Sequence, residues 1–267
     1  MLLLHGFPDH WRLWQPLMPT LATRHRVLAP DLRGINLSGR PLKVDAYRIE
    51  CLVDDVLALI HTRGGRCAVV GHDWGGMLAW VLAARHPTAV SRLAILNAPH
   101  PCRLAQQLRD DPAQRAASAY VRALTQSGAE ARLAEANFER LWAVVASAIP
   151  AAQAQAERHS HVAAWSQPGA LTAMLNWYRA LDFDAALAPA GVPALPALGT
   201  ASGYIEAPTL VLWGEQDGSF PVACLNGLEH WVPRLQLHRV PQGGHWLLRE
   251  QPQWVAERLL DFLAEAH

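Results

Sequence analysis

Short apolar segments alternate along the chain with longer segments in which apolar residues recur at helical spacing. Segments of this kind are typical of parallel strands that are buried on both faces. Six of them have strand-like composition and end near glycine, proline or aspartate: residues 2–4, 26–30, 67–71, 93–97, 208–213 and 235–240.

The intervening segments place their apolar residues on one face of a helix. The three clearest faces are Leu52, Val56, Leu59 and Ile60; Leu78, Val81 and Leu82; and Val255, Leu259, Leu260 and Phe262. Strands that alternate with helices predict an α/β fold with a mostly parallel, doubly wound sheet and helices on both faces.

The strand pattern stops between residues 102 and 204, where alanine, glutamine, arginine and glutamate are frequent. This composition predicts several short helices, followed by an irregular return to the sheet over residues 189–203. We therefore expect residues 1–101 to form the first part of an α/β core and residues 206–267 to form its second part. Residues 102–205 would form a helical cap over the ligand-binding edge of the sheet.

Composition excludes several classes of partner. The 267 residues are 51% hydrophobic, which suits one large core with an insertion, and 23 basic residues balance 23 acidic ones. A net charge of zero does not favour nucleic acid or an anionic membrane surface, and no apolar run is long enough to span a bilayer. The four cysteines show no metal-binding spacing, which is typical of free thiols and weakly favours a cytoplasmic location.

The strongest chemical signal is the segment Gly71-His72-Asp73-Trp74-Gly75-Gly76, which follows an apolar strand and precedes a helix. This is the context of the G-x-S-x-G nucleophile elbow, with Asp73 at the position of the serine. The following helix N-terminus stabilises an anion there. The alternative interpretation is that Asp73 only caps the helix.

Two further signals follow in the chain order of a hydrolase triad, which is nucleophile, acid, histidine. His245 comes after the last strand and a Gly-Gly pair, which suits a general base that reaches over the sheet edge. Asp217 follows the preceding strand and could orient that histidine, with Glu215 as the competing acid.

The first strand runs into His5-Gly6-Phe7-Pro8. A loop at this place supplies one backbone N–H of the oxyanion hole, and the residue after the nucleophile supplies the other. Phe7 and Trp74 are therefore the expected donors, while an ordinary turn is the alternative interpretation of the loop.

These segments together resemble the soluble epoxide hydrolases of the α/β-hydrolase superfamily. The resemblance runs from end to end and is weakest between residues 102 and 205. It is carried by HGFPDHW (5–11), DLRGINLSGRP (31–41), GHDWGG (71–76), LNAPHP (96–101), LNWYR (175–179), WGEQD (213–217) and GGHW (243–246). GHDWGG is shared with haloalkane dehalogenases, whereas HGFP and LNWYR are more particular to epoxide hydrolases.

The resemblance implies conversion of a small apolar epoxide and water into a vicinal diol, through an alkyl ester on Asp73. Two tyrosines of the cap would bind the epoxide oxygen. Tyr178 matches one through LNWYR, and Tyr120 matches the other because it follows Asp111-Pro112. The resemblance implies no cofactor and no metal.

Two other functions stay open on the sequence: a haloalkane or haloacid dehalogenase with the same triad, and a non-catalytic ligand-binding homologue. Phe7 counts against the haloalkane dehalogenases, which usually place Asn or Trp there, and Trp74 stands where fluoroacetate dehalogenases carry Arg. Asn97 stands where some relatives carry the triad acid, which favours Asp217 as the acid. Family members usually have two strands before the first one here, so we expect an unpaired edge near residues 27–30. This predicts a truncated or mis-started chain or an unusual fold edge, and an edge that could pair with another chain in a homodimer.

Overall fold

A computed structural model describes residues 1–181 and 203–265. Its centre is a parallel five-stranded sheet in the order β1-β2-β3-β4-β5. The strands are β1 (Leu2–Leu4), β2 (Cys67–His72), β3 (Val90–Leu96), β4 (Thr209–Gly214) and β5 (Leu235–Val240). The predicted α/β fold and five of the six predicted strands are confirmed.

The sixth predicted strand, at residues 26–30, is wrong. Only Leu28 pairs, through an isolated parallel bridge to Leu2. Its N–H donates to the carbonyl oxygen of Met1, and its carbonyl oxygen accepts from the N–H of Leu3. Because β1 is only three residues long, it offers this segment too few partners for a regular ladder.

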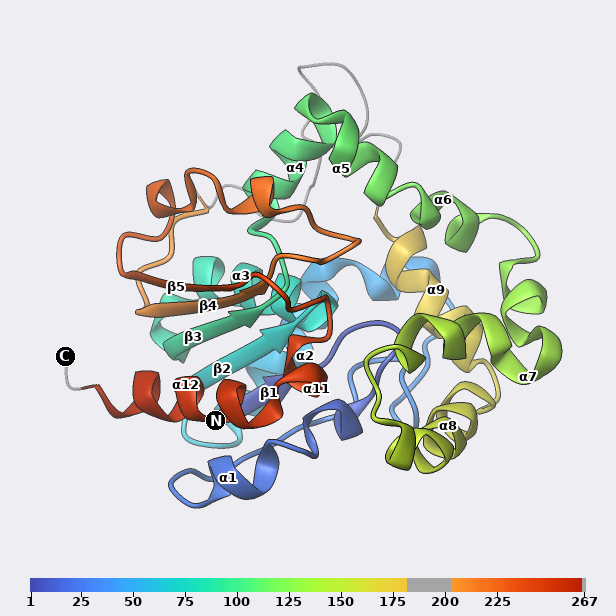
Figure 1. The fold of residues 1–267 in the computed structure, drawn as a ribbon, viewed down its shortest axis with the longest axis horizontal. Coiled ribbons are helices and arrows are strands. Elements are labelled where there is room, and N and C mark those ends of the chain that lie inside the picture. Colours follow the sequence, from blue (N-terminus) through green and yellow to red (C-terminus); the bar gives the residue numbers. More distant parts are fainter. Residues whose placement is uncertain (182–202, 266–267) are drawn as a thin grey trace.

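Helices cover both faces of the sheet (Figure 1). Helices α2 (Ile49–His61) and α3 (Trp74–Arg85) pack on one face, and α1 (Met18–Ala22), α11 (Leu247–Glu250) and α12 (Pro252–Ala264) lie on the other. Neighbouring strand residues divide between these two cores; Val69 belongs to the first and Val70 to the second. A strand buried on both faces explains the continuous apolar segments in the sequence.

Between β3 and β4 the chain forms further helices, drawn in green to yellow in Figure 1. They are α4 (Pro101–Asp110), α5 (Pro112–Ala117), α6 (Tyr120–Thr125), α7 (Ala129–Ala146), α8 (Ala151–Trp165) and α9 (Ala170–Arg179). The expectation of short helices is wrong for α8, which has 15 residues. The span of α7 consists of two short helices that meet at a kink, which agrees with the expectation. Residues 135–138 form this kink and have non-helical backbone angles, three of them with positive φ. The alanine-rich composition of residues 151–165 favours the longer α8.

The predicted irregular return over residues 189–203 lies outside the described residues except at Gly203. The division into residues 1–101, 102–205 and 206–267 stays a prediction. Within the described residues no helix is both long and apolar enough to cross a membrane.

Candidate active site

The nucleophile elbow is a tight turn between β2 and α3. Asp73 adopts φ 52° and ψ −123°, a strained conformation for a residue with a side chain. The turn closes because glycines flank it. A Cβ atom on Gly75 would lie 2.1 Å from the carbonyl oxygen of Leu4, and one on Gly71 would lie 2.4 Å from that of Gly75. The chain therefore accepts strain here and presents the carboxylate above the sheet edge.

The carboxylate of Asp73 does not cap α3, because its side chain makes no cap hydrogen bond. Its Oδ1 instead accepts a hydrogen bond of 2.8 Å from the backbone N–H of Phe7, across 66 residues of sequence. The backbone N–H of Trp74 also donates to this carboxylate. The two expected oxyanion donors thus converge on the same group, beside a cis Phe7–Pro8 peptide bond.

Burial dominates the electrostatics of Asp73, which is 6% exposed. Burial raises the pKa of Asp73 above its ordinary value, and the positive charge of His245 and the N–H groups of Trp74 and Phe7 oppose this only in part. The carboxylate is therefore poorly solvated, which makes it a stronger nucleophile than a carboxylate in water.

His245 lies between two carboxylates. Its Nδ1 is 2.8 Å from Oδ2 of Asp217, and its Nε2 is 3.6 Å from Oδ2 of Asp73. The competing acid, Glu215, instead forms an ion pair of 2.7 Å with Arg239. Burial lowers the pKa of His245, but the charges of Asp217 and Asp73 outweigh it and raise the pKa to about 9.

Asp217 is held by donors on both of its oxygens. The backbone N–H groups of Ser219 and Phe220 donate to Oδ1 at 2.7 and 3.0 Å, and Asn97 Nδ2 donates to Oδ2 at 2.8 Å. Burial raises the pKa of Asp217, but His245 and these donors outweigh it, so the pKa lies below its ordinary value. The carboxylate therefore stays charged and orients the imidazole ring.

The sequence did not reveal the role of Asn97. In the sequence, Asn97 was considered only as an alternative position for the acid. Besides its hydrogen bond to Asp217, its amide both donates to and accepts from the backbone of Gly214. His72 was also missed: it is fully buried, and its Nε2 lies 2.8 Å from the carbonyl oxygen of His245. The available signals were that His72 directly precedes the candidate nucleophile and that Asn97 follows the strand after which some relatives carry the acid.

The two expected tyrosines lie together near Asp73. Tyr178 on α9 is 3% exposed, and its ring packs edge-on against Phe7 and Trp74, at 5.1 and 5.3 Å between ring centres. Tyr120 at the start of α6 is 40% exposed, and its ring lies 6.3 Å from that of Tyr178. Although the side chain of Tyr120 is partly exposed, the surroundings of both hydroxyl groups are buried. This burial, together with the charge of Asp73, raises the pKa of both hydroxyl groups above 10, so both stay protonated.

A mostly apolar cavity of about 70 Å³ connects these groups. Its polar wall contains Asp73, Tyr120 and Tyr178. Its apolar wall is formed by Ile49, Trp74, Met77, Val81, Leu104, Leu108, Val121, Leu181 and Phe220. A second space lies beside Phe7, Met174 and Trp177, but its 10 Å³ is about the volume that holds one water molecule. Of these two spaces, the larger one is lined by Asp73 and has more room for a ligand.

The residues that the structure describes hold no group of three or more histidine, cysteine, aspartate or glutamate side chains arranged to bind a metal ion. The site does bring a carboxylate, a histidine–aspartate pair, two N–H donors and two phenols around one cavity. This arrangement can perform nucleophilic displacement followed by hydrolysis of an ester.

Comparison with known proteins gives a consistent picture. The family model of the alpha/beta hydrolase fold matches residues 1–252. The chain is 35% identical to the AB hydrolase superfamily protein YfhM of Bacillus subtilis, over 98% of this chain and 89% of that protein. It is also 35% identical to epoxide hydrolase 3 of Xenopus tropicalis, over 99% of this chain and 71% of that protein.

Among solved structures, the epoxide hydrolase of Bacillus megaterium in complex with an inhibitor superimposes with a TM-score of 0.89 and 30% identity. The match covers 99% of this chain and 93% of that one. The chain therefore belongs to the α/β-hydrolase superfamily and, within it, to the epoxide hydrolase family.

Proposed function

We propose that this protein hydrolyses epoxides to vicinal diols through an ester on Asp73. The observation that carries the proposal is the cavity in which Asp73 shares the wall with two protonated tyrosines. An epoxide needs a nucleophile on one side and proton donors for its oxygen on the other. The relatives named epoxide hydrolases support the same conclusion.

In the first step, an oxygen of Asp73 attacks an epoxide carbon, the ring C–O bond breaks, and an ester forms. Oδ1 already accepts the N–H of Phe7, so Oδ2 is the oxygen that attacks. The epoxide oxygen takes a proton from Tyr178 or Tyr120. Their raised pKa keeps the hydroxyl groups protonated until an alkoxide, which is a stronger base, develops beside them.

Formation of the ester also prepares the base for the second step. The charge of Asp73, 3.6 Å from His245, helps to raise the histidine pKa to about 9 in the free enzyme. The ester removes this charge, so the pKa of His245 falls and the imidazole releases its proton, which returns to the tyrosine. His245 therefore becomes a base when the intermediate needs one.

In the second step, His245 takes a proton from water, and the resulting hydroxide attacks the carbonyl carbon of Asp73. The N–H groups of Phe7 and Trp74 stabilise the oxyanion on Oδ1, by about 3 kcal/mol for each donor. The ester C–O bond then breaks and the diol leaves. One proton of the water stays on His245 and the other goes to the diol, so the starting state is restored.

The size and the apolar lining of the cavity favour an epoxide that carries one apolar substituent. This substituent would lie against Met77, Val81 and Leu104, because the neighbouring space beside Trp177 holds about one water molecule. Helices α4–α9 would then act as the cap over the site, within the proposed cap of residues 102–205.

The experiment that tests the proposal is to trap the ester. His245→Gln protein is incubated with terminal epoxides or haloalkanes, and the intact protein is weighed. We expect a mass gain equal to one whole epoxide, mapped to the peptide that contains Asp73, and no gain in an Asp73→Asn/His245→Gln control. A gain from haloalkanes alone, with halide released, would instead establish a dehalogenase. A folded protein that gains no mass would contradict the mechanism.

A further inference from the structure

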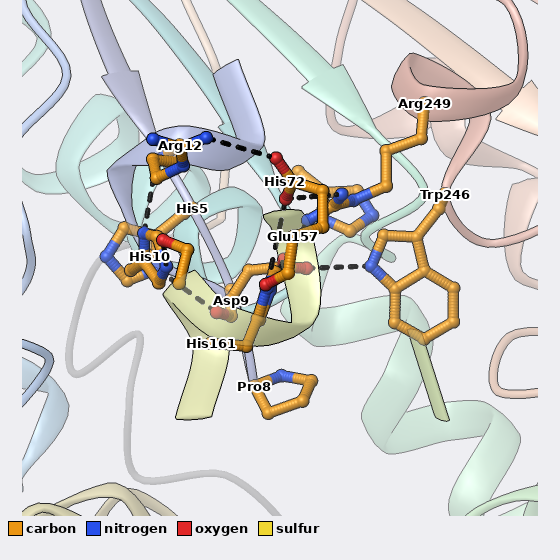
Figure 2. Close-up of polar contacts among 12 residues, drawn as sticks. His5, Pro8, Asp9, His10, Arg12, His72, Glu157, His161, Trp246 and Arg249 are labelled. Carbon is orange, nitrogen blue, oxygen red and sulfur yellow. Dashed lines mark hydrogen bonds and ion pairs between the residues drawn. The ribbon is translucent and has the colours of Figure 1, made fainter. Parts of the chain in front are cut away.

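A second buried polar cluster lies outside the candidate active site (Figure 2). We call it the Asp9 cluster, and it consists of Asp9, Glu157, His161, Trp246 and Arg249. Asp9 is 1% exposed and His161 is fully buried. These residues come from three separate segments: the loop after β1, helix α8, and the segment that runs from Trp246 into α11. The cluster therefore joins parts of the chain that are far apart in sequence.

Asp9 is the centre of the cluster because three side chains approach its carboxylate. Trp246 Nε1 donates to Oδ2 at 2.8 Å, and Arg249 donates to Oδ1 at 2.5 Å. His161 Nε2 lies 3.0 Å from Oδ1. Burial raises the pKa of Asp9, but Arg249 and His161 outweigh it and hold the pKa well below its ordinary value. Short hydrogen bonds to a charged acceptor are among the strongest in proteins.

The cluster contacts the loop that carries His245. Trp246 is the next residue, and its ring packs edge-on against the imidazole with 4.7 Å between ring centres. The carbonyl oxygen of His245 is held from the other direction by His72, at 2.8 Å. Asp9 thus fixes the side chain that follows the base, while His72 fixes the backbone of the base itself.

The same cluster contacts the loop of the oxyanion hole and helix α8. Asp9 lies two residues after Phe7, whose N–H is bonded to Asp73. From α8, His161 approaches Asp9, and Trp165 Nε1 donates to the carbonyl oxygen of Pro8 at 2.8 Å. The oxyanion loop, the base loop and α8 therefore meet at one carboxylate.

We propose that Asp9 is a positioning residue for the hydrolytic step, and that it acts through its hydrogen bond with Trp246. This inference rests on the proposed two-step hydrolysis. Asp9 fixes where His245 lies relative to the oxyanion donors, and hence where the activated water meets the ester. The groups that react in the first step are Asp73 and the tyrosines, and the Asp9–Trp246 hydrogen bond contacts none of them, so we expect the first step not to depend on it.

Trp246→Phe is the most direct test, because it removes the donor to Asp9 and keeps a flat apolar ring and every charge. Wild type and variant are mixed with a terminal epoxide, quenched at short times and weighed, which measures formation and decay of the ester separately. We expect formation at the wild-type rate and decay slower by about tenfold or more, since displacement of a catalytic group by about 1 Å is costly. The ester should accumulate, and kcat and KM should fall together.

A matched control is Trp14→Phe. Trp14 is fully buried, whereas Trp246 is partly buried, so the control substitution is at least as demanding for packing. Within the described part of the chain the indole N–H of Trp14 has no hydrogen-bond partner. The control should leave both rates unchanged. A second variant, Asp9→Asn, should slow ester decay further, because it weakens the acceptor of all three donors.

Two outcomes would overturn the positioning role. One is ester decay in Trp246→Phe at the rate of Trp14→Phe; the other is an equal fall in both steps, which a smaller folded fraction would produce. The proposed function fails separately, because then the wild type and His245→Gln would form no ester at all.

Discussion

The candidate catalytic set of Asp73, Asp217 and His245 and the Asp9 cluster are built from the same types of residue. In each, a buried histidine has one aspartate near 3 Å and a second carboxylate further away. His245 lies 2.8 Å from Asp217 and 3.6 Å from Asp73. His161 lies 3.0 Å from Asp9 and 3.8 Å from Glu157. Trp246 contacts both groups, through its ring on one side and its Nε1 on the other.

The two groups differ in what neutralises their carboxylates. Arg249 lies 2.5 Å from Asp9 and 3.3 Å from Glu157, so the cluster contains its own fixed cation. Asp73 has two backbone N–H donors and a histidine whose proton can leave. Burial therefore prevails at Asp73 and raises its pKa, whereas the charge of Arg249 and the hydrogen bond of His161 prevail at Asp9 and lower its pKa.

The second difference is access. Asp73 lines a cavity of about 70 Å³, while Asp9 is enclosed by its three donors. A carboxylate acts as a nucleophile only if one oxygen keeps a free lone pair that faces a substrate. Residue types alone therefore do not separate a reactive site from a structural one, and the fixed cation and the cavity do.

The largest effect should come from Asp73→Asn. We expect turnover to fall by at least about 10⁴-fold, because loss of a nucleophile removes the whole covalent route. The free energy of unfolding should stay the same or rise, since a buried carboxylate with a raised pKa opposes folding in its charged form. Steady-state kinetics and urea denaturation test both parts. A lower free energy of unfolding would mean that the contacts of the charged Asp73 carboxylate stabilise the fold, as those of Asp9 do.

Arg249→Met should lower the stability of the protein, in contrast to Asp73→Asn. It leaves Asp9 and Glu157 buried without their cation, so we expect the free energy of unfolding to fall by about 3–5 kcal/mol. Arg239→Met is the matched control, because its ion pair with Glu215 is partly exposed and should contribute less than about 1 kcal/mol. Urea denaturation at neutral pH measures both. Equal losses for the two variants would contradict the structural role of the cluster.

Removal of one tyrosine hydroxyl group tests the role of the cavity that Asp73 lines. Tyr178→Phe should lower the rate of ester formation by about 10²-fold, within the usual range for a general acid. Tyr120 still supplies a hydroxyl group in this variant, so we expect a larger fall in activity in the double variant Tyr178→Phe/Tyr120→Phe. Rapid quenching with intact mass measures ester formation directly. An unchanged rate in Tyr178→Phe would show that Tyr120 alone supplies the proton.

Much of the fold could be predicted because buried parallel strands and helices leave periodic patterns. The strand at residues 67–71 and the helical face from Leu52 to Ile60 were both predicted and lie in β2 and α2. The segment at 26–30 has the same composition, yet it forms a single bridge. A segment forms a strand only if the neighbouring strand offers it enough hydrogen-bond partners, and β1, with three residues, is too short to do so.

Asp73, Asp217 and His245 could be predicted because each follows a strand in a recognisable turn, whereas Tyr178 and Tyr120 were expected only through the resemblance. The Asp9 cluster could not be predicted in this way. Asp9 and Trp246 lie in segments that the resemblance identified, but His161 and Glu157 lie in α8, where composition alone was informative. Their contacts depend on how α8 packs against the loop after β1, and a sequence pattern with local periodicity does not contain that information.

The smallest effect we expect is a shift in pH dependence between the two states of His245. In the free enzyme the pKa of His245 is raised to about 9, because the charges of Asp217 and Asp73 outweigh burial. In the ester, Asp73 carries no charge, so the pKa falls and the neutral base is present at lower pH. Ester decay should therefore rise with pH and level off below pH 9. Single-turnover decay measured across pH gives this midpoint, and a midpoint at or above 9 would mean that the charge of Asp73 does not control the base.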